Sequence, residues 1–304
     1  MYTTRHFPAD FARPSEREFI LRALAYYGAR AIKRWLIGIF NLKSQRWRDA
    51  KEVRAAYDAE RGYTLDHMDR LTFDELVYGS ADRFDQVREC DFVLLNDRIQ
   101  WAPTRDSRRF LIQEIERRIT ELVPAGGTVA EFGSGSGRNL LYLKSCLPDR
   151  QFIGLELSPV SVQLARRLSA RYEHPVRFEV ANACESLPHP PTVPTHVDLA
   201  FSTHALEMMP RTFVRAIDNM LSIASRHVLF FEPIPELWPS TPRGLASRAR
   251  AYVMDRLRGF MPELRPRAAS SGWMIAEAAR LKTSTNPINE TALVRLARRD
   301  SEVS

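Results

Sequence analysis

Hydrophobic positions in the first third of the chain recur at helical spacing. Between residues 15 and 121, apolar side chains such as Ile20, Leu24 and Tyr27 follow one another at steps of three or four residues, which is the period of an α-helix with one buried face. A further helix is predicted over residues 106–122, because proline and glycines in the segment 124–127 are typical helix stops. The first third is therefore predicted to be mostly α-helical.

After Gly127 the pattern changes to short β-type runs separated by segments of helix length. The first five runs are residues 128–132, 151–157, 176–180, 197–202 and 227–232. Such alternation predicts parallel strands joined by helices. Two last runs, 281–285 and 291–296, are separated by a segment too short for a crossover helix, so they are predicted to form an antiparallel hairpin that completes a seven-stranded sheet.

The first of these strands leads into a glycine-rich turn, Glu131-Phe-Gly-Ser-Gly-Ser-Gly137. Glycines let the main chain turn sharply and approach a ligand closely. The spacing is Gly-x-Gly-x-Gly, which differs from the Gly-x-Gly-x-x-Gly of dinucleotide binders, and Arg138-Asn139 stands where a phosphate loop needs Lys-Ser/Thr. By itself the motif also fits an ordinary surface turn.

An acidic residue at the end of the next strand favours a binding site over an ordinary turn. Glu156 lies about twenty residues beyond the glycines, at the carboxyl end of the second predicted strand. A carboxylate in that position can accept both ribose hydroxyls of a nucleoside. The turn and Glu156 together predict a nucleoside-containing ligand.

On these residues, the segment 128–298 resembles the class I S-adenosylmethionine-dependent methyltransferases. The resemblance implies an α/β fold of the Rossmann-like kind, with a seven-stranded, mostly parallel sheet whose last strand is antiparallel, and S-adenosyl-L-methionine as the cofactor. It places the turn from Glu131 to Gly137 under the methionine part of the cofactor, Glu156 at the ribose, and Asn182 with Ala183 beside the adenine, where an aspartate is more usual. The residues expected at the cofactor are Glu131, Gly133, Ser134, Gly135, Gly137, Asn139, Glu156, Leu157, Asn182, Ala183 and Ser202.

Candidates for the chemical step follow the fourth and fifth strands, because ligands of an open α/β sheet bind beyond the carboxyl ends of its strands. His204 can act as a base toward a hydroxyl, a phenol or an ammonium group, and a structural hydrogen bond to a loop is a nearly equal alternative. Glu207 can orient His204 or bind substrate, although a solvated carboxylate at a helix start is the preferred interpretation. Glu232-Pro233 faces the same crevice.

Composition and charge narrow the class of protein. The chain has 304 residues, of which 44% are hydrophobic and 27% charged, with a formal net charge of +7; this is ordinary globular composition. Its three cysteines lie far apart and lack ligand spacing, so neither a disulfide framework nor a metal site is expected. Without an apolar run near ~20 residues or a visible secretory signal, a cytoplasmic protein with no transmembrane segment is expected.

Arginines concentrate in residues 235–270, which are interpreted as a helical insertion near the substrate entrance. Arg243, Arg248, Arg250, Arg256, Arg258, Arg265 and Arg267 lie there against only three acidic residues. They can bind a phosphate, a carboxylate, nucleic acid or a membrane surface, with a solvated helix face given roughly half the weight. The amphipathic stretch 20–40 fits a lid over the active site better than a peripheral membrane contact.

The sequence therefore predicts a helical N-terminal cap over residues 1–105 and a methyltransferase domain over residues 106–304. The tetrapeptide Asp/Asn-Pro-Pro-Tyr/Phe resembles the signature of enzymes that methylate base nitrogens, and the segment after the fourth strand lacks it. A small-molecule acceptor methylated at oxygen, or at nitrogen, is therefore favoured, and a nucleic-acid acceptor is disfavoured. Three alternatives stay open. They are a protein or RNA methyltransferase that uses the basic regions, a noncatalytic cofactor-binding partner subunit, and a nicotinamide-dependent oxidoreductase, against which the third glycine argues.

Overall fold

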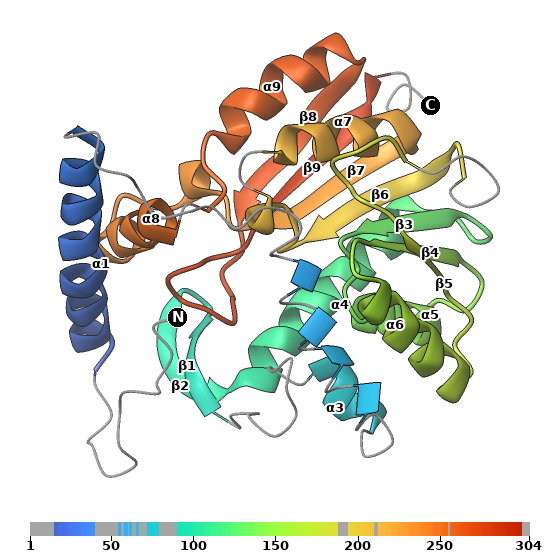
Figure 1. Cartoon of the computed structure of the whole chain (residues 1–304), viewed down its shortest axis with the longest axis horizontal. Coiled ribbons are helices and arrows are strands. Elements are labelled where there is room, and N and C mark those ends of the chain that lie inside the picture. The colour runs from blue at the N-terminus through green and yellow to red at the C-terminus, as the bar shows by residue number, and fades with distance from the viewer. Residues whose placement is uncertain are drawn as a thin grey trace.

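A seven-stranded sheet with helices on both faces forms the centre of the protein (Figure 1). The computed structural model describes residues 15–39, 72–78, 90–187, 194–209, 212–254 and 256–299, and four two-residue pieces between 54 and 66. The strand order is β5-β4-β3-β6-β7-β9-β8, and neighbours are parallel except in the two pairs that include β9. The strands are β3 Thr128–Phe132, β4 Gln151–Glu156, β5 Arg177–Val180, β6 Val197–Thr203, β7 Ala224–Glu232, β8 Trp273–Arg280 and β9 Ala292–Arg298.

The helices divide between the two faces because the central strands present apolar side chains on both sides. On one face α3, α4, α5 and α6 pack over residues such as Val129 and Phe152. On the other, α7 and α9 pack over residues such as Phe132 and Phe230. The bounds are α3 Phe73–Tyr78, α4 Thr104–Leu122, α5 Arg138–Cys146, α6 Pro159–Arg171, α7 Phe213–Ile223 and α9 Phe260–Ser270. The fold class, the five parallel strands and the helix predicted over residues 106–122 are confirmed.

A second packing unit lies beside the sheet and joins segments that are far apart in the sequence. Helix α1 (Glu16–Ile39) packs against α8 (Pro242–Met254) and against a two-stranded hairpin (Figure 1). Their shared core includes Phe19, Tyr27, Phe92 and Ala246. The opposite side of α1 leaves apolar side chains exposed, namely Leu21, Ile32, Trp35 and Leu36. None of the helices described is both long and apolar enough to cross a membrane.

The prediction that the first third is mostly helical is wrong for residues 90–103. Strands β1 (Cys90–Leu95) and β2 (Arg98–Pro103) form an antiparallel hairpin. Asn96 and Asp97 lie at its turn with φ values of 49° and 68°, and positive φ at both central residues is the geometry that continues the natural twist of a hairpin. Asn and Asp tolerate that conformation, so Asn-Asp between two apolar runs was the signal of this turn.

The first arm of the C-terminal hairpin is also placed wrongly by the sequence pattern. It is β8, Trp273–Arg280, and not residues 281–285. β8 is an edge strand whose side chains are mostly half-buried or exposed, and three of its eight residues are alanines, which are depleted in strands. Residues 281–291 form the connection to β9, and Ser284 within it pairs with Leu94 of β1. The connection is largely buried beside the hairpin, and the β-branched Thr283 and Thr285 give its start the character of a strand.

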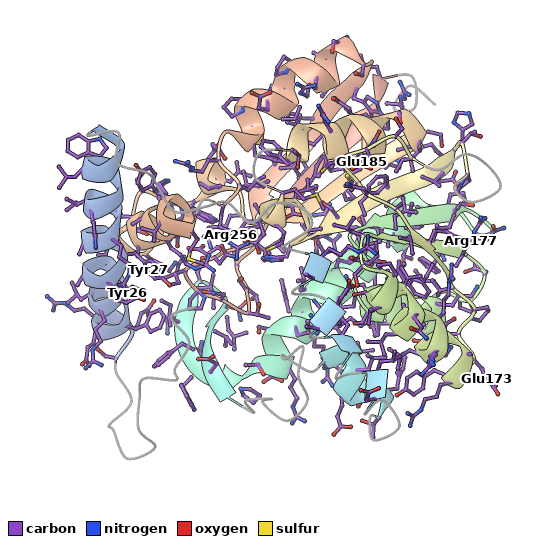
Figure 2. All side chains as sticks on the ribbon, in the orientation of Figure 1. Tyr26, Tyr27, Glu173, Arg177, Glu185 and Arg256 are labelled. Carbon is purple, nitrogen blue, oxygen red and sulfur yellow. The ribbon has the colours of Figure 1, made fainter. Side chains whose placement is uncertain are left out.

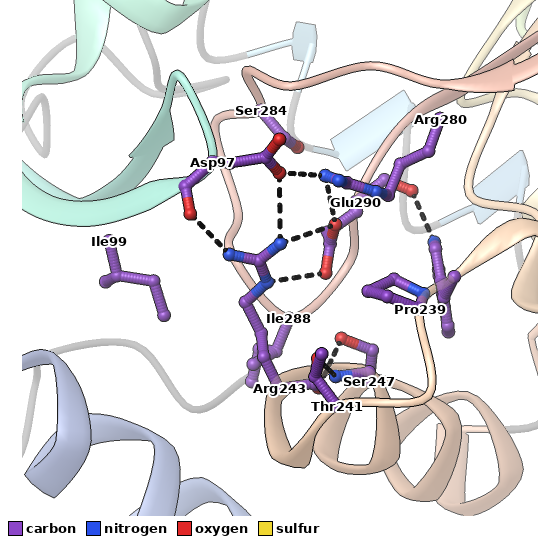
Figure 3. A network of polar contacts seen from close by, with 12 residues as sticks. Asp97, Ile99, Pro239, Thr241, Arg243, Ser247, Arg280, Ser284, Ile288 and Glu290 are labelled. Carbon is purple, nitrogen blue, oxygen red and sulfur yellow. Dashed lines mark hydrogen bonds and ion pairs between the residues drawn. The ribbon is translucent and has the colours of Figure 1, made fainter.

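Two arginines and two carboxylates join the hairpin, α8 and this connection (Figure 3). Arg243 Nε donates to Glu290 Oε1 at 3.0 Å, and Arg243 Nη1 donates to the main-chain oxygen of Asp97 at 2.8 Å. Arg280 Nη1 lies 2.5 Å from Asp97 Oδ1 and 3.0 Å from Glu290 Oε2. Burial raises the pKa of Glu290, and both guanidinium groups oppose that rise. Paired charges therefore hold α8 against the hairpin and the sheet.

Arg243→Met is expected to lower the free energy of unfolding by about 3 kcal/mol, because Glu290 would remain fully buried with one guanidinium group instead of two. The measurement is chemical denaturation of the purified protein. Arg22→Met, which removes an exposed ion pair with Glu18 on α1, is the matched control and should change stability little. Equal losses in the two variants would contradict a stabilising role for the buried network.

Candidate active site

The glycine-rich turn between β3 and α5 lies at the carboxyl end of the sheet. Gly133, Gly135 and Gly137 have positive φ values of 76°, 55° and 76°. The N–H of Gly133 donates to the carbonyl of Leu155 at 2.8 Å, which ties the turn to β4. Gly137 is the N-terminal cap of α5, so the first N–H groups of that helix point toward the turn.

Two of the three glycines have no room for a side chain. A Cβ on Gly133 would lie 2.5 Å from the Cβ of Ala205, and one on Gly137 would lie within 3.0 Å of the Phe178 ring. Gly135 differs, since a Cβ there would meet nothing within 4 Å among the residues described. Gly133 and Gly137 are therefore needed for packing, whereas Gly135 borders open space that a ligand can enter.

Glu156 closes the turn from the side of β4. Its Oε2 accepts the N–H of Gly135 and its Oε1 accepts the N–H of Ser158, both at 2.9 Å. Burial raises the pKa of Glu156, and these two N–H groups oppose the rise. Each carboxylate oxygen has a further lone pair, so Glu156 can still accept a pair of hydroxyl groups.

Glu131 carries a buried oxygen that lacks a donor. Its side chain is 1% exposed, and Oε1 accepts a hydrogen bond from Asn139 Nδ2. Oε2 has no partner in the described part of the chain. Burial raises the pKa of Glu131 to about 7, against the effect of Asn139. A buried acceptor without a donor is energetically unfavourable, so this oxygen marks a place for a donor or cation of a ligand.

Three more predicted residues, Ser134, Leu157 and Ser202, lie at the same edge of the sheet. In the strand register, Phe132 at the end of β3 pairs with Leu155 of β4 and with Ser202 of β6. Ser202 is fully buried, and Ser134 Oγ is a second buried oxygen for which the described residues offer no partner. The structure thus brings the ends of these three strands together.

Asn182 and Ala183 follow β5, and their polar atoms mainly stabilise their own turn. Asn182 Oδ1 accepts the N–H of Cys184 at 3.0 Å, and its Nδ2 donates to Glu185 at 2.8 Å. The carbonyl of Ala183 accepts from Asn219 Nδ2 at 2.8 Å. These hydrogen bonds fix the main chain of the turn, and Ala181 N donates to the carbonyl of Glu156 at the end of β4 at 2.9 Å.

His204 follows β6 in a backbone conformation that residues with a side chain rarely adopt, with φ of 51°. Its Nδ1 lies 3.0 Å from Glu207 Oε1 and its Nε2 lies 2.8 Å from Thr291 Oγ1. If Nδ1–H donates to the carboxylate, Nε2 accepts the hydroxyl of Thr291. Both ring nitrogens therefore have partners within the protein.

The interpretation of Glu207 as a solvated carboxylate is wrong. Glu207 lies in the short helix η4 (Leu206–Met208), is 7% exposed, and accepts from Asn289 Nδ2 at 3.2 Å. Burial would raise its pKa, but His204 and nearby arginines hold the pKa at about 2. Glu207 is thus a buried partner of His204, and the surrounding cations favour its ionised form at neutral pH.

Glu232, at the end of β7, binds the main chain of residues 205–207. Its carboxylate accepts the N–H groups of Ala205, Leu206 and Glu207 at 3.0 to 3.4 Å. Burial raises the pKa of Glu232 to about 7. It therefore satisfies the main chain of η4, where the sequence pattern had suggested only a crevice residue.

Sequence patterns missed the polar residues that reach this site from elsewhere. Thr291 and Asn289 come from the connection between β8 and β9, and Arg250 comes from α8. Arg250 Nη1 donates to Asn289 Oδ1 at 2.5 Å and also interacts with Tyr27 of α1. Figure 2 shows Tyr27 and Arg256 between α1 and the sheet domain. Only the tertiary fold brings these residues together, so no local spacing could indicate them.

The interpretation of residues 235–270 as a solvated arginine face is wrong in part. The insertion forms two helices, α8 on α1 and α9 on the sheet, after the short η5 (Pro235–Leu237). Arg243 and Arg250 are buried, Arg256 pairs with Glu207, and Arg267 pairs with Asp218. Most of these arginines therefore contact acidic or polar groups of the protein itself.

Comparisons with known proteins agree with this geometry. Residues 129–226 match the family model described as "Methyltransferase domain". The search of curated proteins gives no match. Among solved structures, magnesium protoporphyrin IX methyltransferase from Synechocystis PCC 6803 with bound SAH is 14% identical, with 82% of this chain and 100% of that chain covered and a TM-score of 0.56. The [4+2]-cyclase SpnF is also 14% identical, with 84% and 97% covered and a TM-score of 0.52.

Gly137→Ala is expected to lower the free energy of unfolding by more than about 2 kcal/mol, because it combines a left-handed backbone with a clash against Phe178. Gly135→Ala is the matched comparison. It introduces backbone strain alone, about 1 kcal/mol, because its Cβ points into open space. Denaturation of both variants measures the difference, and an equal loss would contradict the assignment of Gly137 to packing.

Proposed function

We propose that this class I S-adenosylmethionine-dependent methyltransferase transfers a methyl group to an oxygen of a small-molecule acceptor. Two observations carry the proposal: the open space at Gly135, whose N–H donates to Glu156, and the buried oxygen of Glu131 that has no partner among the described residues. S-adenosylmethionine has matching groups, since its ammonium group suits a buried carboxylate and its ribose hydroxyls suit Glu156.

The described residues fit this cofactor at several points. Glu131 and the turn from Gly133 to Gly137 would hold the methionine part, and Glu156 would hold the ribose. Asn182 and Ala183 would lie beside the adenine, where main-chain groups take the place of the more usual aspartate. Leu157, Ser134, Asn139 and Ser202 complete the set that we assign to the cofactor.

The cofactor supplies a methyl group on a sulfonium, and the protein needs to align the acceptor and accept its proton. His204 is our candidate for the base, because the hydrogen bond between Nδ1 and Glu207 orients the ring at the end of β6. Nε2 faces Thr291, so an acceptor hydroxyl reaches this nitrogen by displacing the Thr291 hydroxyl or by passing its proton through it.

Two observations support a small acceptor over an acidic polymer. Arg243 and Arg250 are buried in polar networks, so they are unavailable to bind RNA or an acidic protein surface. A structure of the same fold is named for magnesium protoporphyrin IX, which is a small molecule. A hydroxyl acceptor loses its proton on methylation, and the His–Glu pair can accept that proton; an amine or ammonium acceptor would use the pair in the same way.

One comparison supports a second candidate function, in which the protein binds the cofactor without transferring its methyl group. SpnF has this fold and is named as a [4+2]-cyclase, so the fold alone does not determine the reaction. Cofactor binding without turnover across a broad acceptor panel would favour this alternative.

Calorimetric titration with S-adenosylmethionine, S-adenosylhomocysteine and NAD in parallel tests the cofactor. The first two are expected to bind, and Glu156→Ala should weaken both by at least about tenfold through lost hydrogen bonds to the ribose. Glu121→Ala, an exposed carboxylate of α4, should leave binding unchanged. Preference for NAD, or no binding to any of the three, would overturn the proposal.

His204→Ala is expected to slow methyl transfer by about 10²-fold or more, with unchanged affinity for S-adenosylmethionine, because a general base contributes to the chemical step alone. The measurement is single-turnover transfer to the acceptor that a screen identifies. Unaltered turnover would assign His204 a structural role between Glu207 and Thr291.

A further inference from the structure

Arg108 connects the helices before the sheet to the glycine-rich turn. It lies on α4, is 7% exposed, and donates from Nη2 to Asn139 Oδ1 at the start of α5. Its Nε donates to the main-chain oxygen of Val77 in α3 at 3.4 Å. A guanidinium group offers donors and no acceptor, so Arg108 can contact only the oxygen end of the Asn139 amide.

That restriction determines which way the Asn139 amide points. With Oδ1 facing Arg108, Nδ2 faces Glu131 and donates to Oε1. A rotated amide would place its NH₂ against the guanidinium and its oxygen against the carboxylate, which are two repulsive contacts. The hydrogen bonds therefore run in one direction, from Arg108 through Asn139 to Glu131.

The same direction leaves the second oxygen of Glu131 for a ligand. Asn139 occupies Oε1, while Oε2 is buried without a partner among the residues described. The positive charge of Arg108 also favours the ionised form of Glu131 against the effect of burial. We propose that Arg108 is a positioning residue for the cofactor, which acts through Asn139 to present Glu131 Oε2 to the cofactor's ammonium group; this rests on the proposed function.

The proposal gives the helical region before the sheet a part in cofactor binding. Neither Arg108 nor Val77 lies within residues 129–226, which match the methyltransferase family model. Because Val77 holds the guanidinium from the α3 side, the position of α3 influences how Asn139 and Glu131 are arranged. The affinity for cofactor therefore depends on a segment outside the glycine-rich motif.

The test is calorimetric titration of S-adenosylmethionine with Arg108→Met between about pH 5.5 and 8.5, since only ionised Glu131 pairs with an ammonium group. Wild-type affinity should fall as the pH decreases below about 7, the pKa of Glu131. The variant should bind about tenfold more weakly at pH 7, with its pH midpoint shifted upward, because loss of the nearby cation disfavours ionised Glu131. Arg105→Met, an exposed arginine one turn earlier, should match the wild type.

A double-mutant cycle with Asn139→Ala tests the route of the effect. If Arg108 acts through Asn139, the double variant should bind about as weakly as Asn139→Ala alone at about pH 8.5, where the direct effect of the Arg108 charge on the ionisation of Glu131 is smallest. Arg108→Gln is the second variant if the methionine variant does not fold, because its amide can donate to Asn139 but does not force one orientation; it should show the same upward shift.

The possible failures are distinguishable. Wild-type protein that binds no S-adenosylmethionine would overturn the proposed function. Wild-type binding with unchanged affinity and pH midpoint in Arg108→Met or Arg108→Gln would overturn only the positioning role. Fully additive losses in the cycle would also overturn it, because Arg108 would then act independently of Asn139.

Discussion

The close approach of main chain at Gly133 and Gly137 is the constraint on which the site depends. Gly133 lies against Ala205, and Gly137 lies against the Phe178 ring, so the turn after β3 packs onto the segment after β6 and onto β5 itself. This packing brings Glu131, at the end of β3, next to Asn139 at the start of α5. With larger residues at these positions, the strand ends would separate and the acceptors that we assign to the cofactor would no longer converge.

The site also buries three glutamate side chains. Glu131, Glu207 and Glu232 are each less than 9% exposed, and burial alone would raise the pKa of all three. Only Glu207 has a low pKa, because His204 and arginines surround it. Two of the cations, Arg108 on α4 and Arg250 on α8, come from helices outside the glycine-rich motif, and they lower the pKa of Glu131 and Glu207 against the effect of burial.

Sequence patterns predicted the parts of the fold that rest on local periodicity. The five parallel strands, the helix α4 and the antiparallel direction of the last strand follow from apolar runs and the lengths between them. The hairpin at Asn96-Asp97 was missed because the helical spacing on both sides of it was extended across it. The strand β8 was misplaced because its alanines and Glu277 are depleted in strands, whereas Thr283 and Thr285 just after it are β-branched and favour a strand.

In the site, too, the sequence predicted the residues that follow a local spacing and missed those that arrive by long-range packing. The glycines and Glu156 follow a spacing along the chain, and they lie together at the carboxyl edge as expected. Glu207 appeared solvated because its sequence gives no sign of the inward turn of η4. Thr291, Asn289 and Arg250 could not be found, because they reach His204 and Glu207 only through long-range packing.

The contact between the early hairpin and the late connection also bears on the order of folding. Asn96 donates to Thr283 across 187 residues of sequence, and β9 inserts between β7 and β8 near the end of the described chain. During synthesis, β1 and β2 emerge long before the segment that covers them. The parallel strands can pair while the chain is still growing, whereas the hairpin, α8 and the Arg243–Glu290 pair can assemble only once the C-terminal strands are available. The hairpin, α8 and the Arg243–Glu290 pair are therefore completed only after all five parallel strands have been synthesised.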